Sequence, residues 1–392
     1  MSNKTTDNEI RILASEGWTR RNFMKIAAMA GGVAALSING VALAASSLAD
    51  KAKALGDGAN LGDVLFIYSW ADYANPDVLD AFSGGAGPRI QIATFDSVEA
   101  AIAKLQIAGG SAGYDIVVVG DAYVEQVIAR ELVQKLDHSK IPNLKNLRDQ
   151  FRNLPFDPDN QYTVLKNFGT IGILYNNKII TEEIKNWDDF FRVAASKAAS
   201  GRVCLLNDQP SVFGLVFWRE GKDYNTGDEK KLREATDILI KDLVPHVKAF
   251  DARPVQGLLS GDYVIAQGYQ GSCRHIFAQD AENYTWVYPE PQCVVWSDHY
   301  AVPTGAKNVD AAHAFINFML DPDVAAAETG HIGYDTGVEG VIEKLPDDVI
   351  RKDLIVFPEG VLDRLIYQKV EGSNPTLRID LFNEIKAAAA RQ

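Results

Sequence analysis

Cysteine is scarce in this sequence, and the few cysteines present form no metal-binding pattern. The 392 residues include three, Cys204, Cys273 and Cys293, which allow at most one disulfide. There is no C-x-x-C pair, and no pair of histidines lies near any of the three. We therefore expect no metal site built on cysteine. Buried free thiols are the simplest interpretation, and a bond between Cys273 and Cys293 stays open.

Clustered basic residues and nucleotide-binding loops are also absent. Lysine and arginine number 39 against 52 aspartates and glutamates, which gives a formal net charge of −13. Because binding to phosphates requires clustered lysine and arginine, nucleic acid is not an expected partner. None of the patterns G-x-G-x-x-G, G-x-x-x-x-G-K-[ST] and G-x-S-x-G occurs. We therefore predict no cofactor and no acyl-transfer active site.

Beyond residue 45, no stretch is long and apolar enough to cross a membrane. The first 44 residues differ from the rest of the chain. Paired arginines, Arg20 and Arg21, precede Phe23, a weakly hydrophobic Ala/Gly-rich run follows, and Ala42-Leu43-Ala44 fits signal peptidase. This pattern predicts that residues 1–44 are a twin-arginine signal peptide, cleaved after Ala44, which sends the protein to the periplasm. An ordinary Sec signal or a single membrane anchor is the alternative.

The rest of the chain alternates between strand and helix patterns. In the first half, apolar strands are predicted at 64–68, 90–95 and 114–119, and helices at 75–82, from Ser97 onward and at 123–132. Gly84 to Pro88 is expected to end the first of these helices. Later strands are predicted at 172–175, 203–206, 247–250 and 263–267, and helices at 232–243 and 309–320. This order predicts two α/β lobes, whose interface is a favoured place for a ligand.

A series of short motifs then suggests a family. YSWADY with a following Asn-Pro, YDIVVVGDAYV, PFDPDNQYTV, WDDF, GYQGS, Trp296-Ser297-Asp298, INFMLDPDVAA and HIGYDTG occur in this order. Together they resemble the solute-binding proteins of polyamine ABC transporters, the spermidine/putrescine-binding family, over residues 64–370. The resemblance implies a two-lobed type II periplasmic-binding fold, with a hinge and a ligand cleft between the lobes. It also implies a monomer that is not an enzyme and that delivers its ligand to a membrane permease.

The resemblance implies lobe boundaries as well. Lobe 1 would comprise residues 61–168 and 297–340, and lobe 2 residues 169–296 and 341–392. The chain would then cross between the lobes near Gly169, Trp296 and Val341.

The family's ligand site can be transferred where residues match. Trp70 and Tyr73 would flank the methylene chain of the ligand, while Trp296 would supply a wall and Asp298 the carboxylate that holds an amine. The remaining matches are Tyr269 (usually tryptophan), Tyr334, Gln368 and, in the second lobe, Asp208. These residue types suit a polyamine, because each buried ammonium needs a carboxylate and aromatic faces cover methylenes and attract cations.

The chain also departs from the family pattern. Gly120, Asp121 and Ala122 stand where serine and tyrosine are usual, and Ser211 replaces the glutamate that holds the second amine. Asp208 or Asp121 could supply that missing carboxylate, which would keep a diamine as the ligand. Alternatively Arg253 or Arg274, which have no counterpart, could bind a carboxylate. The ligand would then be a zwitterion such as 4-aminobutyrate.

Other interpretations of these residues stay open. The two tryptophans could be core residues, as we expect for Tyr68, and Asp208 could belong to a turn ending at Pro210. Arg274 could begin a solvated helix. Two other classes of protein also remain, an exported enzyme with a cofactor and an iron carrier of the same fold class. The only local candidate for iron is Asp298-His299-Tyr300, whose alternation points His299 away from its neighbours.

Overall fold

The computed structural model describes residues 47–55, 61–346, 349, 351–358, 360–369 and 374–391. The predicted signal peptide and its cleavage site lie outside these residues. Among the helices in the described ranges, none combines the length and apolar character that a membrane span requires. The three cysteines are buried and free, as expected.

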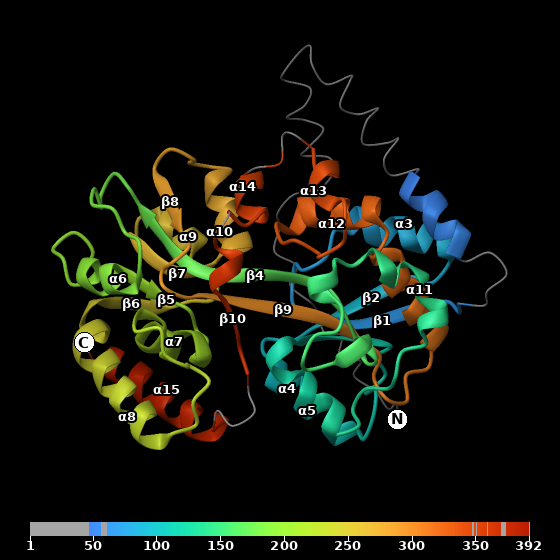
Figure 1. Ribbon diagram of the computed structural model, residues 1–392, viewed down its shortest axis with the longest axis horizontal. Helices are drawn as coiled ribbons and strands as arrows, with labels where there is room; N and C mark the ends of the chain where they lie inside the picture. The colour runs from blue at the N-terminus through green and yellow to red at the C-terminus, as the bar shows by residue number, and fades with distance from the viewer. Residues whose placement is uncertain are drawn as a thin grey trace, which may run out of the picture. The chain divides into compact units, whose positions relative to one another are not determined.

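The strands form one mixed sheet with two parallel portions (Figure 1). Its strands are β1 (Val64–Ser69), β2 (Arg89–Thr94), β3 (Ile116–Gly120), β4 (Thr163–Asn176), β5 (Val203–Leu205), β6 (Val247–Phe250), β7 (Ile265–Tyr269), β8 (Tyr284–Val287), β9 (Cys293–Ala301) and β10 (Leu365–Tyr367). The order is β2-β1-β3-β9-β4-β7-β5-β6, and β10 pairs with β9 while β8 pairs with β4. The β1–β2 and β1–β3 pairs are parallel, as are the β5–β6 and β5–β7 pairs.

The long antiparallel pair of β4 and β9 joins the two parallel portions, and Figure 1 shows the two strands side by side. The first half of β4, from Thr163 to Thr170, pairs with β9, and its second half pairs with β7 and β8. The sequence predicted only residues 172–175 of this strand. Its first half was missed because Lys166 and Asn167 interrupt the apolar pattern.

The helices of the first half are α3 (Pro76–Ala86), α4 (Val98–Ala108) and α5 (Asp121–Ala129), and the first two begin after their predicted caps. The helix predicted at 123–132 begins earlier, at Asp121, without a side-chain cap, and ends earlier, at Ala129. The Asn75 side chain accepts from the backbone N–H of Asp77, and that of Ser97 accepts from Ala100. Helix α3 continues past residue 82 to Ala86 and ends with Gly87 as its C-cap, so the prediction that Gly84 to Pro88 ends it is confirmed. Gly85 is needed inside the helix, because a Cβ there would lie 2.3 Å from the carbonyl oxygen of Ala49.

The remaining helices complete the two halves. They are α6 (Trp187–Ala194), α7 (Gln209–Arg219), α8 (Glu229–Ile238), α9 (Val255–Ser260), α10 (Gln270–Phe277), α11 (Val309–Met319), α12 (Pro322–Ile332), α13 (Val341–Lys344), α14 (Lys352–Ile355) and α15 (Pro375–Ala389). Short 3₁₀ turns occur at His138–Lys140, Pro142–Asn146, Asp149–Phe151, Pro158–Asn160, Val244–His246 and Leu362–Arg364. The helix predicted at 232–243 begins earlier, after the cap Asp228, and ends in a π-helical turn at Leu239–Leu243.

The apolar core follows the division of the sheet. One large cluster packs β1 and β3 against α3, α11 and α12, with Phe82 and Phe315 among its largest buried side chains. A second packs β5 and β7 against α6, α7, α8 and α15 around Trp187 and Trp218. Within β4, Phe168 belongs to the first cluster and Ile171 to the second. The strand therefore passes from one core to the other at Gly169–Thr170.

Candidate ligand-binding site

Several of the predicted site residues meet at one edge of the first parallel portion. Trp70 and Tyr73 follow the end of β1, and Asp121 follows β3, the parallel neighbour of β1. The carboxyl ends of parallel strands lie at the same edge of a sheet. The antiparallel strand β9 brings Asp298 to this edge, because Asp298 is in register with Gly120 on one side and with Asn167 on the other.

Tyr73 is bonded directly to Asp298. Its hydroxyl oxygen lies 2.7 Å from Oδ2 of Asp298 and 2.5 Å from Oδ1 of Asn167. A phenol has one proton to donate, and the Asn167 amide nitrogen is buried without a hydrogen-bond partner in the described ranges. If the amide oxygen and nitrogen of Asn167 are exchanged, the nitrogen gains a partner and the phenol needs to donate only once. The amide then donates to Tyr73, and Tyr73 donates to Asp298.

A buried ion pair lies next to this contact. Nζ of Lys166 is 3.1 Å from Oε1 of Glu328 and 4.2 Å from the centre of the Tyr73 ring. The other oxygen of Glu328 accepts from the backbone N–H of Asn75 at 2.8 Å. This pair was not predicted from the sequence. A lysine inside an otherwise apolar strand is the signal that could have revealed it, because a buried ammonium requires an anionic partner.

Two carboxylates are buried together at this edge. Burial raises the pKa of Asp298, and hydrogen bonds from Tyr73 and Trp70 and the charge of Lys166 partly offset it. Burial also raises the pKa of Asp121 to about 8. Hydrogen bonds from the Ala122 N–H and from Ser297 oppose this shift, whereas the negative charge of Asp298 adds to it. Neither carboxylate belongs to any ion pair within the described chain. Such a site favours a ligand that brings positive charge.

Asp121 is the less satisfied of the two carboxylates. Its Oδ1 accepts from the backbone N–H of Ala122 at 2.8 Å, whereas its Oδ2 is buried with no hydrogen-bond partner among the residues described. The structure places Asp121 beside Ser297 and Asp298. It therefore lies with the first carboxylate, Asp298, although the sequence also allowed it to replace the family's second carboxylate.

Aromatic rings form the wall beside these carboxylates. The ring of Trp296 lies 4.8 Å from that of Tyr334 and 5.8 Å from that of Tyr269, both edge to face. Glycines create the space for them: a Cβ on Gly169 would lie 2.6 Å from Trp296, and one on Gly271 would lie 2.3 Å from Tyr334. The rings therefore depend on the absence of side chains at two positions.

Tyr334 and Trp70 are fixed by different neighbours. The Tyr334 hydroxyl accepts from the backbone N–H of Ser272 at 3.1 Å, and its ring lies 6.3 Å from that of Tyr73. Trp70 packs against Phe95 with ring centres 4.5 Å apart. Tyr68, by contrast, is buried in the core, as expected. We call the converging set the aromatic–carboxylate cluster. It comprises Trp70, Tyr73, Asp121, Tyr269, Trp296, Asp298 and Tyr334.

A second acidic position lies at the start of α7. Asp208 caps this helix, and its Oδ2 accepts from the backbone N–H of Ser211 at 3.1 Å and from the Ser211 hydroxyl. Asp208 is therefore a helix cap, and the predicted turn ending at Pro210 does not form, because Gln209 and Pro210 are the first residues of α7. Burial raises the pKa of Asp208, Ser211 opposes the shift, and the negative charge of Glu99 adds to it. Glu99 accepts from the hydroxyl of Tyr123, and the sequence analysis missed both residues.

The other predicted ligand residues, Gln368, Arg274 and Arg253, are not part of the aromatic–carboxylate cluster. Gln368 is half-buried and follows Tyr367, whose carbonyl accepts from the side chain of Asn225 at 3.1 Å. Arg274 is buried, so the prediction of a solvated helix start is wrong. It donates to the carbonyls of Gly330 and His331 near the end of α12, where a cation is favourable. Arg253 is exposed, 3.5 Å from a carboxylate oxygen of Asp72.

The structure gives no support to an iron site at Asp298-His299-Tyr300. His299 is fully buried, and its Nε2 lies 3.0 Å from the hydroxyl of Ser297. Burial lowers the pKa of His299 to about 3, so the ring is neutral. Within the described ranges no three histidine, cysteine, aspartate or glutamate side chains are arranged to hold a metal ion.

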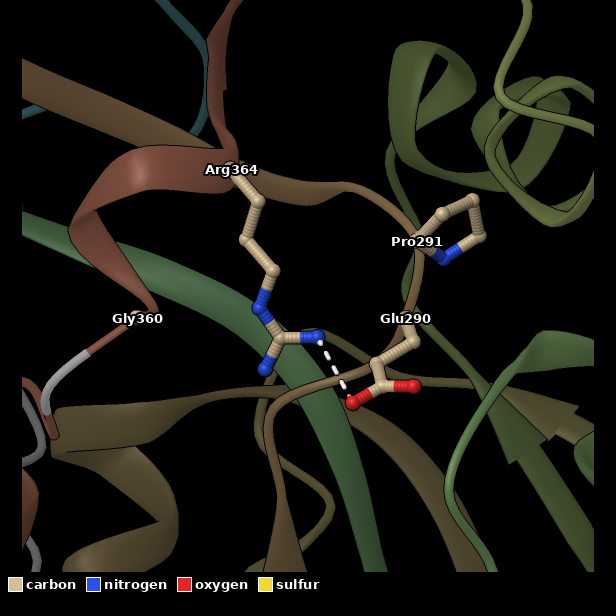
Figure 2. A pocket seen from close by; sticks show the side chains of 4 residues that line it. All are labelled: Glu290, Pro291, Gly360 and Arg364. Carbon is tan, nitrogen blue, oxygen red and sulfur yellow. Dashed lines mark ion pairs between the residues drawn. The ribbon is translucent and has the colours of Figure 1, made fainter.

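A pocket is lined by residues other than the predicted ligand residues (Figure 2). It has a volume of about 280 Å³ and is lined by Glu290, Pro291, Gly360 and Arg364. Figure 2 shows the Arg364 guanidinium turned toward Glu290, at a nitrogen–oxygen distance of 3.6 Å. Arg364 also donates to the carbonyls of Tyr288 and Pro289. This arginine ties neighbouring segments together, and the pocket contains none of the predicted ligand residues.

Known proteins resemble this chain over most of its length. The spermidine/putrescine-binding periplasmic protein 1 of Haemophilus influenzae is 31% identical over 329 residues, covering 83% of this chain and 89% of that protein. The putrescine-binding periplasmic protein PotF of Escherichia coli is 31% identical over 323 residues, covering 78% and 86%. Among solved structures, the spermidine/putrescine ABC transporter substrate-binding protein PotD of Streptococcus pneumoniae superposes with a TM-score of 0.71 at 29% identity, covering 84% of this chain and all of that one.

These likenesses confirm the predicted fold, the two-lobed fold of periplasmic solute-binding proteins. The model of the bacterial extracellular solute-binding protein family matches residues 77–356, well over half of the chain. The chain belongs to the family of bacterial extracellular solute-binding proteins.

Proposed function

We propose that this protein captures a polyamine such as putrescine or spermidine in the periplasm and delivers it to the permease of an ABC importer. The observation that carries the proposal is the pair of buried carboxylates, Asp298 and Asp121, next to aromatic rings and outside any ion pair of the described chain. The printed names of the relatives, which include spermidine and putrescine, support the same ligand class.

The cluster supplies both kinds of contact that a polyamine requires. Asp298, aligned by Tyr73, would receive one ammonium group, and a charge-assisted hydrogen bond of this kind contributes roughly 1.5–3 kcal/mol. The rings of Trp70 and Trp296 would cover the methylenes. A cation near such a ring gains about 0.5–2 kcal/mol once it leaves water.

The second ammonium would bind near Asp208. Ser211 stands where the family's glutamate is expected, but its hydroxyl donates to Asp208 and keeps that carboxylate in place. The carboxylate of Glu99 adds further negative charge near Asp208. The part of the site near Asp208 therefore suits an ammonium group better than a carboxylate. This argues against a zwitterion such as 4-aminobutyrate as the ligand. Of the two arginines that could have bound a carboxylate, Arg274 donates to backbone carbonyls of α12, and Arg253 lies 3.5 Å from a carboxylate oxygen of Asp72.

The proposal also includes the boundaries of the two lobes and the route of export. We assign residues 61–168 with 297–340 to lobe 1 and residues 169–296 with 341–392 to lobe 2. The passage of β4 from one core cluster to the other at Gly169–Thr170 supports this boundary. The protein would act as a monomer whose lobes close on the ligand. Residues 1–44 would direct export through the twin-arginine route.

Calorimetry on the mature protein, residues 45–392, tests the proposal. We expect tight binding of putrescine or spermidine and no measurable binding of 4-aminobutyrate. Putrescine and 4-aminobutyrate share a four-carbon spacing and differ chiefly in one terminal charge, so each serves as the control for the other. Binding of 4-aminobutyrate alone would contradict the polyamine assignment and restore the zwitterion.

A further inference from the structure

Asp121 is a buried acid that direct recognition of one ammonium by Asp298 does not require. Only 5% of its surface is exposed, and its Oδ2 has no hydrogen-bond partner in the part of the chain that the structure describes. It begins α5 and lies beside Ser297 and Asp298 of β9.

The titratable groups that act on Asp121 come from several elements. Asp298 faces it from β9, Tyr367 from β10, and Tyr224 from the segment between α7 and α8. The Tyr224 hydroxyl is itself buried and unpartnered within the described residues, and burial raises its pKa well above the ordinary value. Arg378 donates to the carbonyl of Tyr224 and acts on its ring hydroxyl. Among these groups, none forms an ion pair with Asp121 in the described ranges.

The surroundings favour the ionised form of Asp298 more than that of Asp121. Asp298 accepts a hydrogen bond from Tyr73 and lies in the field of Lys166, and both favour its ionised form. Asp121 has the Ala122 N–H bonded to Oδ1 and smaller support from Ser297, but no cation in the described part of the chain acts on it, and the charge of Asp298 repels its ionised form. Two neighbouring acids in a buried site do not both ionise freely, and the less supported one keeps its proton. Burial raises the pKa of Asp121 to about 8, in agreement with this order.

We propose that Asp121 carries a proton while the site is empty and releases it when the ligand's ammonium enters. The exchange is balanced: the neutral carboxylic acid and the alkylammonium ion become a carboxylate–ammonium pair, and one proton passes to solvent. No covalent bond other than the O–H bond changes. The inference rests on the proposed function, since it requires a cationic ligand, and adds that cation capture is coupled to pH.

The sign of the coupling follows directly. Bound cation stabilises the ionised form of Asp121, so its pKa is lower in the complex than in the empty protein. Affinity therefore rises with pH up to the pKa of the empty site and is constant above it. The ligand's amines stay protonated over this range, because alkylammonium groups lose their protons near pH 10, as lysine does.

The experiment compares wild-type mature protein with Asp121→Asn, using putrescine and spermidine as probes. Titration calorimetry at pH 7 in phosphate and in Tris, whose ionisation enthalpies differ, counts the protons released. We expect about one proton for wild type and about zero for the variant. Between pH 6 and pH 8 the wild-type Kd should tighten about 10-fold or more, while that of the variant should change less than about 2-fold. Asp310→Asn, at an exposed ion pair with Lys140, is the control and should behave as wild type.

Each alternative outcome has a distinct meaning. Tight binding with no proton release and a constant Kd would overturn the coupling and leave the proposed function standing. No binding of either amine between pH 6 and pH 8.5 would overturn the proposed function itself. An equal loss of affinity at both pH values in the variant would assign Asp121 a merely structural role. Asp121→Ser, which restores the residue type usual in the family, replaces Asp121→Asn if circular dichroism shows that the latter does not fold.

Discussion

The two acidic ends of the candidate site are held in different ways. Asp298 lies within the sheet on β9, and its neighbours Tyr73, Asn167 and Lys166 come from two other segments. Asp208 lies at the start of α7 and is held by Ser211, three residues along the chain. The first carboxylate depends on tertiary structure and the second on a local cap. Mutations should therefore have larger effects at the Asp298 end.

The largest effect is expected from Lys166→Met, which removes the cation of the buried pair behind the Asp298 end. Glu328 would remain buried and uncompensated, because both side chains are almost fully enclosed. We expect the free energy of unfolding to fall by about 3–5 kcal/mol. Chemical denaturation measures it, and the double variant Lys166→Met/Glu328→Leu should recover most of the loss. A single variant as stable as wild type would show that the pair contributes little.

The second largest effect is expected from Asp298→Asn, which should change ligand affinity with little change in stability. Asp298→Asn keeps the size of the side chain but leaves the ligand's ammonium without its main anionic partner. We expect putrescine to bind about 2–4 kcal/mol more weakly, with little change in the melting temperature of the empty protein. Calorimetry and thermal unfolding measure the two quantities. Unchanged affinity would remove Asp298 from the site.

The same contrast explains what could be predicted from sequence. The caps Asn75 and Ser97 were predicted because each depends on residues two or three positions apart, and the same local chemistry makes Asp208 a cap where a turn was predicted. Asp298 could be proposed only through the family resemblance, since nothing local distinguishes it from an ordinary strand carboxylate. The need for glycine at position 85 within α3 comes from the distant backbone of residue 49, which no local rule contains.

The residues that were missed share one property. Glu99 interacts with Tyr123, 24 residues away, and Lys166 with Glu328, 162 residues away. Such partners become visible only when the topology is known. The polar interruption of β4 at Lys166 indicated that a partner exists, but its identity required the structure.

At the other end, Asp208→Asn should have a smaller effect. Asparagine is also a good helix cap, so we expect stability to change by less than about 0.5 kcal/mol. The lost charge should weaken putrescine binding by about 1 kcal/mol, or roughly fivefold, because this carboxylate is only partly buried. Ser211→Ala, which removes only the hydroxyl that holds Asp208, is the matched variant and should cost less. A loss as large as that of Asp298→Asn would show that both ends are equally important.

The smallest effect is expected at the ion pair between Asp72 and Arg253, which links the loop after β1 to the segment before α9. Its charged atoms are 3.5 Å apart, and the side chains are 90% and 72% exposed. Exposed pairs of this kind contribute roughly 0–0.5 kcal/mol, because water screens the charges and ordering two long side chains is unfavourable. Arg253→Ala should therefore change the Kd for putrescine less than about 2-fold. Asp72→Asn is the matched control, since it removes the other charge of the same pair. If both variants weakened binding about tenfold, the pair would act as a latch between the proposed lobes, and the Asp298 end would no longer account for most of the affinity.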